Sequence, residues 1–286
     1  MKLIKYFFQF LVIIIFFLIF KLIGYKKAST FSGFIVSFFG PFFRSKKLVI
    51  SNISRALPFK NSDEILMIQN KMWSNYGRIL SDYVFMKNFR KNTLNNNLKI
   101  EGKEILENIK KDGSPVIFIS GHFINFELMA MEIEKSGIKL AAIYRPLNNI
   151  FINYIMEFIR KKYICKNQIK KGLTGIRQVL KLFKKDYSIA LMIDQRVSEG
   201  IKSTFFNKEA FTTTIPAQLV KKFDCKIVPI YIQSVDQFNY KLTVNNPINF
   251  EKTETIQSIT DKLNIILEKM ILKNPEQWIW SHNRWK

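Results

Sequence analysis

The sequence predicts an α/β fold in which helices cover a mostly parallel central sheet, with one transmembrane helix at the N-terminus. Two patterns lead to this prediction. Short, continuous apolar runs recur through the second half of the chain, and longer amphipathic segments separate most of them. This alternation is typical of buried parallel strands with covering helices. The chain also opens on an apolar stretch of about 20 residues, which is enough to cross a bilayer.

The composition narrows the class of protein. The 286 residues include 45 Lys and Arg against 22 Asp and Glu, a formal net charge of +23, and 48% are hydrophobic. So high an apolar content excludes a disordered basic tail. The two cysteines, Cys165 and Cys225, lack the spacing of a zinc ribbon or a disulfide framework, so we expect a reducing compartment. We expect no metal and no bound cofactor.

The N-terminal stretch reads as a membrane anchor. Residues 6–20 contain no charged side chain, and because Lys21 can reach the interface, the apolar run extends to Tyr25. About 20 helical residues at about 1.5 Å each span the roughly 30 Å hydrocarbon layer. A cleavable signal peptide is the competing interpretation, but no small-x-small cleavage site precedes the next lysine pair. We therefore predict an uncleaved anchor at residues 1–25.

Basic residues around the anchor predict its orientation. Two lysines precede it, and six basic residues follow its apolar run: Lys21, Lys26, Lys27, Arg44, Lys46 and Lys47. By the positive-inside rule, the body of the protein lies in the cytoplasm. Residues 31–43 are apolar but broken by Gly, Ser and Pro, and too short to span. They are either part of the core or an interfacial segment whose basic end meets anionic headgroups.

A helical pattern precedes the strands. Ser62 and Asp63 offer a helix start, and apolar residues then recur every three or four positions. These apolar positions are Ile65, Ile68, Met72, Tyr76, Ile79 and Tyr83. Within this helix, Arg78 and Asp82 are spaced for an ion pair.

Four short apolar runs predict strands, at residues 115–120, 139–144, 187–193 and 226–232. Residues 240–244 add an edge strand, and residues 255–272 form a closing helix. No internal repeat and no Gly/Ser-rich linker divides the chain. We therefore predict one domain at residues 26–286, with a helical N-terminal part at 45–90 and an α/β core at 98–286.

Polar residues follow three of the predicted strands. His122 comes two residues after the first strand, Arg145 directly after the second, and Asp194 with Gln195 directly after the third. In an open α/β sheet, ligands bind beyond the carboxyl ends of the strands. We therefore expect a functional site at this edge of the sheet.

His122 and Glu127 form the candidate catalytic pair. Residues five apart on one continuous helix point in different directions, so His122 must precede a helix that has Asn125 as its N-cap and Glu127 in its first turn. There Glu127 stays ionised and holds the imidazole in the tautomer whose other nitrogen is a free base. Since no Ser or Cys has a nucleophile-elbow setting, the pair fits direct activation of a substrate hydroxyl. The alternative is a buried structural histidine.

Residues 121–127, GHFINFE, resemble the H-x4-D/E motif of glycerolipid acyltransferases, in its Glu form. Further segments make the resemblance closest to one branch, the late lauroyl/myristoyl acyltransferases of lipid A biosynthesis. These segments are NYGRILSDY at 75–83, YRP at 144–146, DQR at 194–196 and the tail PEQWIWSHNRWK at 275–286. The resemblance covers nearly the whole chain. It departs at Ile124 and Phe126, where Gly and Trp are usual, and at Asn283, where Arg is common.

The resemblance implies a glycerolipid acyltransferase-like fold and an activity. A fatty acyl group would pass from an acyl carrier protein thioester to the 3-hydroxyl of an acyl chain on a lipid A precursor, giving an acyloxyacyl unit. His122 would take the hydroxyl proton while Glu127 orients the imidazole. The residues implied in substrate binding are Arg145, Arg160, Asp194 and Gln195, with Arg160 a candidate for phosphate contact or charge stabilisation.

Together with the predicted anchor and the charges around it, the resemblance predicts an enzyme of the bacterial inner membrane, single-pass, with its catalytic domain on the cytoplasmic face. We expect a monomer. Two alternatives stay open. One is an enzyme of the same branch that acts on another lipid or glycolipid acceptor. The other is a catalytically inactive, membrane-attached binding protein that has kept the scaffold, which intact His122 and Glu127 argue against.

A run of basic residues is the candidate surface for acidic partners. Between Glu157 and Asp186 there is no acidic residue and there are ten basic ones. An acyl carrier protein is acidic and a lipid A precursor carries phosphates, so this run would steer both. The alternative is a merely solvated face. Nucleic acid is not predicted as a partner, because no zinc, RNP or helix-turn-helix signature is present.

The tail concentrates aromatic residues, with Trp278, Trp280 and Trp285 close to His282. Tryptophan either anchors at a membrane interface or packs in a core. We expect core packing here, with His282 as a hydrogen-bonding partner rather than a second base.

Overall fold

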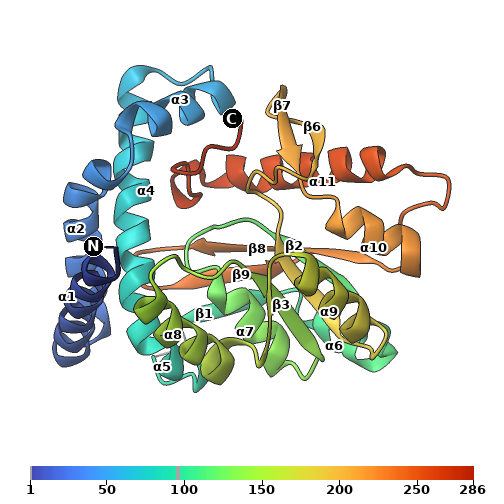
Figure 1. Ribbon diagram of the computed structural model, residues 1–286, viewed down its shortest axis with the longest axis horizontal. Helices are drawn as coiled ribbons and strands as arrows, with labels where there is room; N and C mark the ends of the chain where they lie inside the picture. Colours follow the sequence, from blue (N-terminus) through green and yellow to red (C-terminus); the bar gives the residue numbers. More distant parts are fainter. Residues whose placement is uncertain (1, 95–96) are drawn as a thin grey trace.

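The computed structural model describes residues 2–94 and 97–286 and contains a seven-stranded sheet (Figure 1). Its strand order is β1-β9-β8-β2-β5-β3-β4. Neighbouring strands are parallel, except for the antiparallel pair β8 and β9. The predicted mostly parallel α/β sheet is therefore confirmed. The strands are β1 (Leu98–Glu101), β2 (Ile117–Ser120), β3 (Leu140–Tyr144), β4 (Asn167–Lys170), β5 (Ser188–Met192), β8 (Ile227–Ser234) and β9 (Tyr240–Val244).

The four predicted central strands are β2, β3, β5 and β8, and each overlaps its predicted range. The edge position predicted for residues 240–244 is wrong. This run forms β9, which pairs with β8 on one side and with β1 on the other, so β1 is the edge strand on that side of the sheet. The β1 sequence, LKIE, has only two apolar residues, which is too weak a pattern to predict a strand.

The helices of the α/β part cover the sheet, and most of them connect its strands. They are α6 (Lys103–Asp112), α7 (Glu127–Lys135), α8 (Ile150–Ile159) with the π-helical turn η2 (Arg160–Ile164), α9 (Leu173–Phe183), α10 (Ile215–Phe223) and α11 (Ile256–Lys273). The predicted closing helix is α11, whose N-cap Thr255 accepts a hydrogen bond from the Ser258 backbone. A separate hairpin, β6 (Ile201–Phe205) with β7 (Lys208–Thr212), packs on α11 through the buried Asn264 amide.

The N-terminal helices gather at one end of the sheet (Figure 1). They are α1 (Lys2–Ile23), α2 (Tyr25–Phe43), α3 (Lys46–Ala56), α4 (Ser62–Asp82), the 3₁₀ turn η1 (Tyr83–Phe85) and α5 (Met86–Arg90). The predicted helix start at Ser62 is confirmed. Asn61 is its N-cap and forms a capping box with Glu64, each side chain accepting from the other residue's backbone N–H.

Within the described residues, α1 is the one helix long and apolar enough to cross a membrane. Gly24, with φ 80°, separates it from α2. The α2 helix packs on α4: the Ser32 hydroxyl donates to the Gly77 carbonyl at 2.6 Å, where a Cβ on Gly77 would meet the Ser32 backbone. Its outer face exposes apolar rings at Phe34 and Phe38. One face of residues 31–43 therefore packs on α4, and the interfacial role of the opposite face stays a prediction.

The C-terminal tail packs into the core, as predicted. After the short turn η3 (Pro275–Gln277), Trp278 and Trp280 are 2% and 0% exposed. Their rings meet edge-to-face at 4.6 Å. Trp278 also forms an isolated β-bridge with Phe123, which brings the tail to the loop after β2.

Candidate active site

His122 and Asp194 meet because their strands are neighbours. β2 and β5 pair in parallel, with Ser120 opposite Met192 at their carboxyl ends. His122 and Asp194 each stand two residues beyond these ends. The register therefore brings the two side chains together, and His122 Nδ1 lies 2.7 Å from Asp194 Oδ1.

Asp194 is held by three donors. Besides the imidazole, the His122 backbone N–H donates to Asp194 Oδ2 at 2.7 Å and Trp278 Nε1 donates to the same oxygen at 2.8 Å. The carboxylate is only 3% exposed. Burial alone would raise the pKa of Asp194, but the charge of His122 and these hydrogen bonds hold it low, at about 2. Asp194 is therefore an ionised acceptor for the imidazole.

The second ring nitrogen of His122, Nε2, lies on the side of the imidazole away from Asp194. Within the described part of the chain, no side chain or backbone group bonds its Nε2, and the side chain is 22% exposed. The ring of Phe126 packs edge-on against the imidazole at 5.0 Å. Burial opposes protonation of His122, but Asp194 and the charge of Glu127 outweigh it and raise the pKa above its usual value.

The prediction that Glu127 holds the imidazole is corrected by this geometry. The hydrogen-bond partner of His122 Nδ1 is Asp194, which the sequence placed among the substrate-binding residues. Glu127 starts α7 and faces Arg160 instead, so it acts on His122 through its charge.

Glu127, Arg160 and Tyr83 form a second buried cluster. Arg160 Nε and Nη2 lie 2.7 and 2.6 Å from Glu127 Oε1, and the Tyr83 hydroxyl donates to the same oxygen. Burial disfavours the Arg160 charge, but Glu127 and Tyr83 outweigh burial and raise its pKa. The guanidinium also lies over the Tyr144 ring, 5.6 Å from its centre. The YRP segment thus contributes its tyrosine to the cluster.

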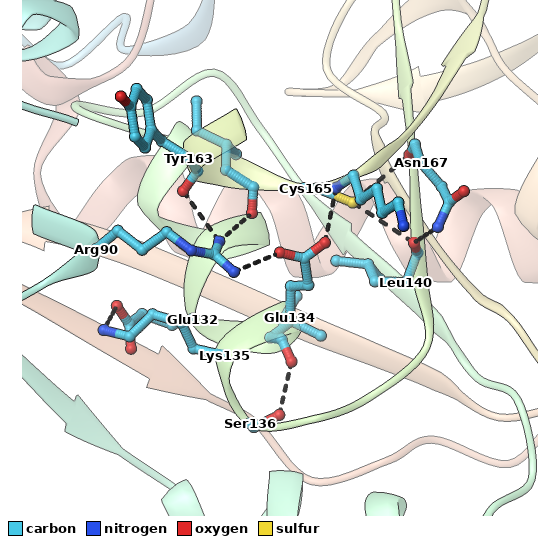
Figure 2. Close-up of polar contacts among 12 residues, drawn as sticks. Arg90, Glu132, Glu134, Lys135, Ser136, Leu140, Tyr163, Cys165 and Asn167 are labelled. Atoms are coloured by element: carbon cyan, nitrogen blue, oxygen red, sulfur yellow. Dashed lines mark hydrogen bonds and ion pairs between the residues drawn. The ribbon is translucent and has the colours of Figure 1, made fainter. Parts of the chain in front are cut away.

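A polar brace holds η2 beside α7 (Figure 2). Arg90 Nη1 donates to the Tyr163 and Ile164 carbonyls at 3.1 and 3.4 Å, and its Nη2 lies 2.9 Å from Glu134 Oε2. The other Glu134 oxygen accepts from the Lys166 backbone N–H at 2.7 Å. Glu127 and Arg160 are the first residues of α7 and η2, so this brace fixes both segments near the ion pair.

Asn125 is not the N-cap that the sequence suggested. The residue before α7 is Phe126, and no side chain caps this helix. Asn125 has φ 41°, in the left-handed region that Asn tolerates better than most residues. Its buried amide turns away from the helix end and donates to Asp82 Oδ2 at 2.7 Å.

The expected ion pair between Arg78 and Asp82 is absent from the described ion pairs. Arg78 Nη1 instead donates to Ser29 Oγ at 3.1 Å, while Asp82 accepts from Asn125 and Tyr240. The two side chains diverge because their partners belong to different elements.

His282 accepts the Arg196 backbone N–H at Nε2, at 3.0 Å, and burial lowers the pKa of His282 to about 4. It is therefore a neutral hydrogen-bonding partner, as expected.

Two predicted substrate-binding residues are not joined to this cluster. Arg145 is exposed and Gln195 is half-buried. In the part of the chain that the structure describes, neither side chain forms a hydrogen bond or an ion pair. Across residues 2–94 and 97–286, no group of three or more His, Cys, Asp or Glu side chains is arranged to hold a metal ion.

Sequence reasoning missed two residues that hold the site. Tyr83 belongs to the segment NYGRILSDY, where the spacing predicts only an apolar position of a helix, but its hydroxyl donates to Glu127. Trp278 is buried, as predicted for the core, but its indole N–H also donates to Asp194. The available signal was the need of a buried Tyr or Trp for a hydrogen-bond partner.

The whole chain, residues 1–286, matches the sequence model of a family described as bacterial lipid A biosynthesis acyltransferase. The chain belongs to this family. Among lipid A acyltransferases, it is 25% identical over 195 residues to the lipid A biosynthesis acyltransferase of Haemophilus influenzae, covering 66% of this chain and 60% of that protein. It is 21% identical over 242 residues to the lipid A biosynthesis myristoyltransferase of Escherichia coli, covering 82% and 73%.

A third relative is the lipid A biosynthesis palmitoleoyltransferase of Escherichia coli, 24% identical over 191 residues that cover 65% of this chain and 61% of that protein. The matched region thus spans about 60% of the length of the first of these lipid A acyltransferases. Among solved structures, the chain is similar to the 1-acyl-sn-glycerophosphate acyltransferase of Thermotoga maritima. That match has a TM-score of 0.42 and 13% identity, and covers 96% of this chain and 99% of that one.

Proposed function

We propose that this protein is a membrane-bound O-acyltransferase that moves a fatty acyl chain from acyl carrier protein to a hydroxyl of a lipid A precursor. The supporting observation is the His122 imidazole, which Asp194 fixes at Nδ1 while Nε2 stays unbonded within the described residues. It stands at the carboxyl ends of the central strands, in a chain of the lipid A acyltransferase family.

The reaction needs one proton carrier. Nε2 of His122 takes the proton of the acceptor hydroxyl as its oxygen attacks the thioester carbonyl carbon. A C–O bond forms, and the tetrahedral intermediate collapses by breaking the C–S bond. The departing thiolate takes the proton back from the imidazolium, which leaves an ester, a free thiol and neutral His122. Asp194 stabilises the imidazolium and does not itself accept the proton.

Glu127 and Arg160 support this base from the second cluster. In this proposal Arg160 pairs with Glu127, and the Glu127 charge favours the imidazolium that forms during attack. Glu127 therefore acts through electrostatics rather than by contact. Arg145 and Gln195, at the ends of β3 and β5, are the candidates for contact with the acceptor.

The membrane placement follows from α1. In this proposal α1, the one described helix long and apolar enough to cross a membrane, anchors the protein in the bacterial inner membrane. The catalytic body lies on the cytoplasmic face, and the exposed α2 rings lie at the interface. The protein acts as a monomer.

Nine of the ten basic residues between Glu157 and Asp186 are exposed, and this basic surface attracts the acidic donor. These nine residues are Lys161, Lys162, Lys166, Lys170, Lys171, Arg177, Lys181, Lys184 and Lys185.

The experiment compares three forms of the full chain in cells that lack their own enzyme. Mass spectrometry of the lipid fraction should show lipid A that is heavier by one acyl chain with the wild-type protein and with Lys222→Ala, an exposed control. His122→Ala should abolish this product while remaining folded in the membrane. If the wild-type protein acylates a different lipid, then lipid A is not the acceptor. If His122→Ala keeps full activity, then His122 is not the catalytic base.

A further inference from the structure

Asp82 and Asn125 face each other behind the loop that carries His122. Asp82 ends α4, and Asn125 lies between β2 and α7. Asn125 Nδ2 donates to Asp82 Oδ2 at 2.7 Å, and the Tyr240 hydroxyl donates to the same oxygen at 2.7 Å. Both Asp82 and Asn125 are 0% exposed. A polar atom without a partner is therefore costly here.

One further oxygen on each of these two side chains needs a hydrogen-bond donor. Within residues 2–94 and 97–286, neither Asp82 Oδ1 nor Asn125 Oδ1 has a hydrogen-bond partner. An ionised carboxylate cannot supply one, because its oxygens only accept. A protonated carboxyl can, because a carboxylic acid and an amide that face each other form two hydrogen bonds: the acid O–H donates to the amide oxygen, and the amide N–H donates to the other acid oxygen. A single proton then satisfies both atoms.

We propose that Asp82 carries a proton on Oδ1 and donates it to Asn125 Oδ1, and that this two-bond acid–amide pair positions the loop of residues 121–126. Within the described residues, Asp82 forms no ion pair. Arg78 directs its guanidinium to Ser29, and Tyr25 and Tyr240 are neutral phenols. Burial raises the pKa of Asp82 to about 7, against the opposing influence of Tyr240, Arg78 and Asn125.

The pair connects α4 to the residues of the site. Asn125 lies three residues after His122 and two before Glu127, at the left-handed turn where the chain leaves β2 and enters α7. Holding its amide fixes the turn, and the turn sets where the imidazole stands relative to Asp194. This positioning role depends on the proposed function, whereas the protonation of Asp82 does not.

Infrared spectroscopy tests the proton directly. At about pH 6, below the raised pKa, the difference spectrum of wild type and Asp82→Asn should show the loss of one carbonyl band of a protonated carboxyl. The control Asp63→Asn, at an exposed position of the same helix, should show no such loss. An Asp82→Asn spectrum without this loss would overturn the protonation.

Kinetics test the positioning. Asp82→Asn keeps an acceptor for Tyr240 and both bonds to Asn125, so kcat should stay within about threefold of wild type. Asp82→Leu removes the pair, and kcat should fall roughly tenfold or more at little change in KM. Where Asp82→Leu fails to fold, Asn125→Gly deletes the amide but keeps the left-handed backbone, with the same expected loss. Wild-type kcat in the folded variants would overturn the role, whereas an active His122→Ala would overturn only the proposed function.

A different set of contacts concerns α8. Its N-cap Asn149 donates Nδ2 to the Tyr6 carbonyl at 2.8 Å. The Phe151 ring lies 5.7 Å from the Phe7 ring and 5.7 Å from the Phe10 ring. The α8 helix is therefore packed against the N-terminal half of α1, the apolar part of the anchor.

The outer side of α8 is also apolar. Ile150, Tyr154 and Phe158, four residues apart, are 57%, 78% and 54% exposed. A helix that is apolar both toward the protein and away from it needs apolar surroundings on both sides. Because its inner partner is the membrane anchor, we infer that α8 enters the bilayer with α1 and that this stripe contacts lipid hydrocarbon. The α8 side of the catalytic body is then immersed in the bilayer, and only the rest of the body lies on the cytoplasmic face.

Fluorescence quenching tests this contact in the full chain, reconstituted in phosphatidylethanolamine and phosphatidylglycerol vesicles. A fluorophore on Tyr154→Cys should be quenched by nitroxide-labelled lipids and protected from iodide. The matched control is Ile265→Cys, an exposed apolar position on α11, which should show the reverse. The native Cys165 and Cys225 are buried and stay in place. Equal quenching by iodide at both positions would overturn the inference.

Discussion

Asp194 accepts two hydrogen bonds from one residue, His122, at the imidazole Nδ1 and at the backbone N–H, each 2.7 Å long. The same carboxylate therefore fixes both the ring and the start of the loop that presents it. Trp278, from the far end of the chain, donates a third hydrogen bond to Asp194, and this bond is 2.8 Å long. Asp194 controls the orientation and the basicity of His122 together.

The variant Asp194→Asn should separate these effects through its pH profile. The Asp194 charge raises the pKa of His122, so its removal should lower that pKa and shift the acidic limb of kcat/KM to lower pH. The base is also misoriented, so kcat should fall by roughly 10²- to 10⁴-fold. An acidic limb that stays at the wild-type pH would show that His122 is not the titrating base.

The Glu127–Arg160 pair should behave as a buried ion pair. Its side chains are 7% and 11% exposed, so Arg160→Met leaves an uncompensated buried carboxylate and should cost about 3–5 kcal/mol in the free energy of unfolding. The double variant Glu127→Gln with Arg160→Met should recover part of this loss. Denaturant unfolding of the detergent-solubilised protein measures both. Strictly additive losses would contradict a direct coupling of the two charges.

The edge of the sheet that carries the site could largely be predicted from the sequence, because the end of a strand shows as an apolar run followed by polar residues. His122, Arg145 and Asp194 all follow such runs. Which of them meet depends on strand order, and strand order is set by long-range pairing. β2 lies between β8 and β5, so His122 meets Asp194 from β5, while β3 and Arg145 lie one strand further away.

Local patterns also failed where tertiary contacts override them. Asn125 before Glu127 suggested an N-cap, but its amide is taken by Asp82 from α4. Likewise, the spacing of Arg78 and Asp82 suggested an ion pair, but Tyr240 and Asn125 hold Asp82 on the other side. Partners from distant segments decided both cases, and a single sequence does not reveal them.

The Arg90 brace should contribute more stability than an exposed ion pair of similar length. Arg90 and Glu134 are 32% and 21% exposed, and Arg90 also binds two carbonyls, so Arg90→Met should cost about 1–3 kcal/mol. Lys202→Met is the control, because the Lys202–Glu209 pair is 61% and 71% exposed and such pairs contribute less than about 1 kcal/mol. Thermal unfolding midpoints compare the two. Equal shifts would mean that the brace does not hold η2.

The exposed basic surface leads to a prediction about the donor. Changing Lys161, Lys162 and Lys171 to Glu should raise KM for acyl carrier protein several-fold, because the acidic donor is then repelled during encounter. The increase should shrink at high salt, where the Debye length falls to about 3 Å at 1 M. kcat should change little, since Arg160 and its partners stay intact.

The control for the effect of net charge alone reverses the charge of three lysines that lie outside the basic surface. Lys208, Lys222 and Lys269 are exposed on β7, α10 and α11, so their change to Glu alters the net charge equally without altering the basic surface. KM for the carrier protein should then stay near wild type. If both triple variants raise KM equally at low salt, the attraction comes from the net charge of +23 rather than from this surface. The basic surface then has no specific role, because uniform charge attracts an acidic partner from every direction.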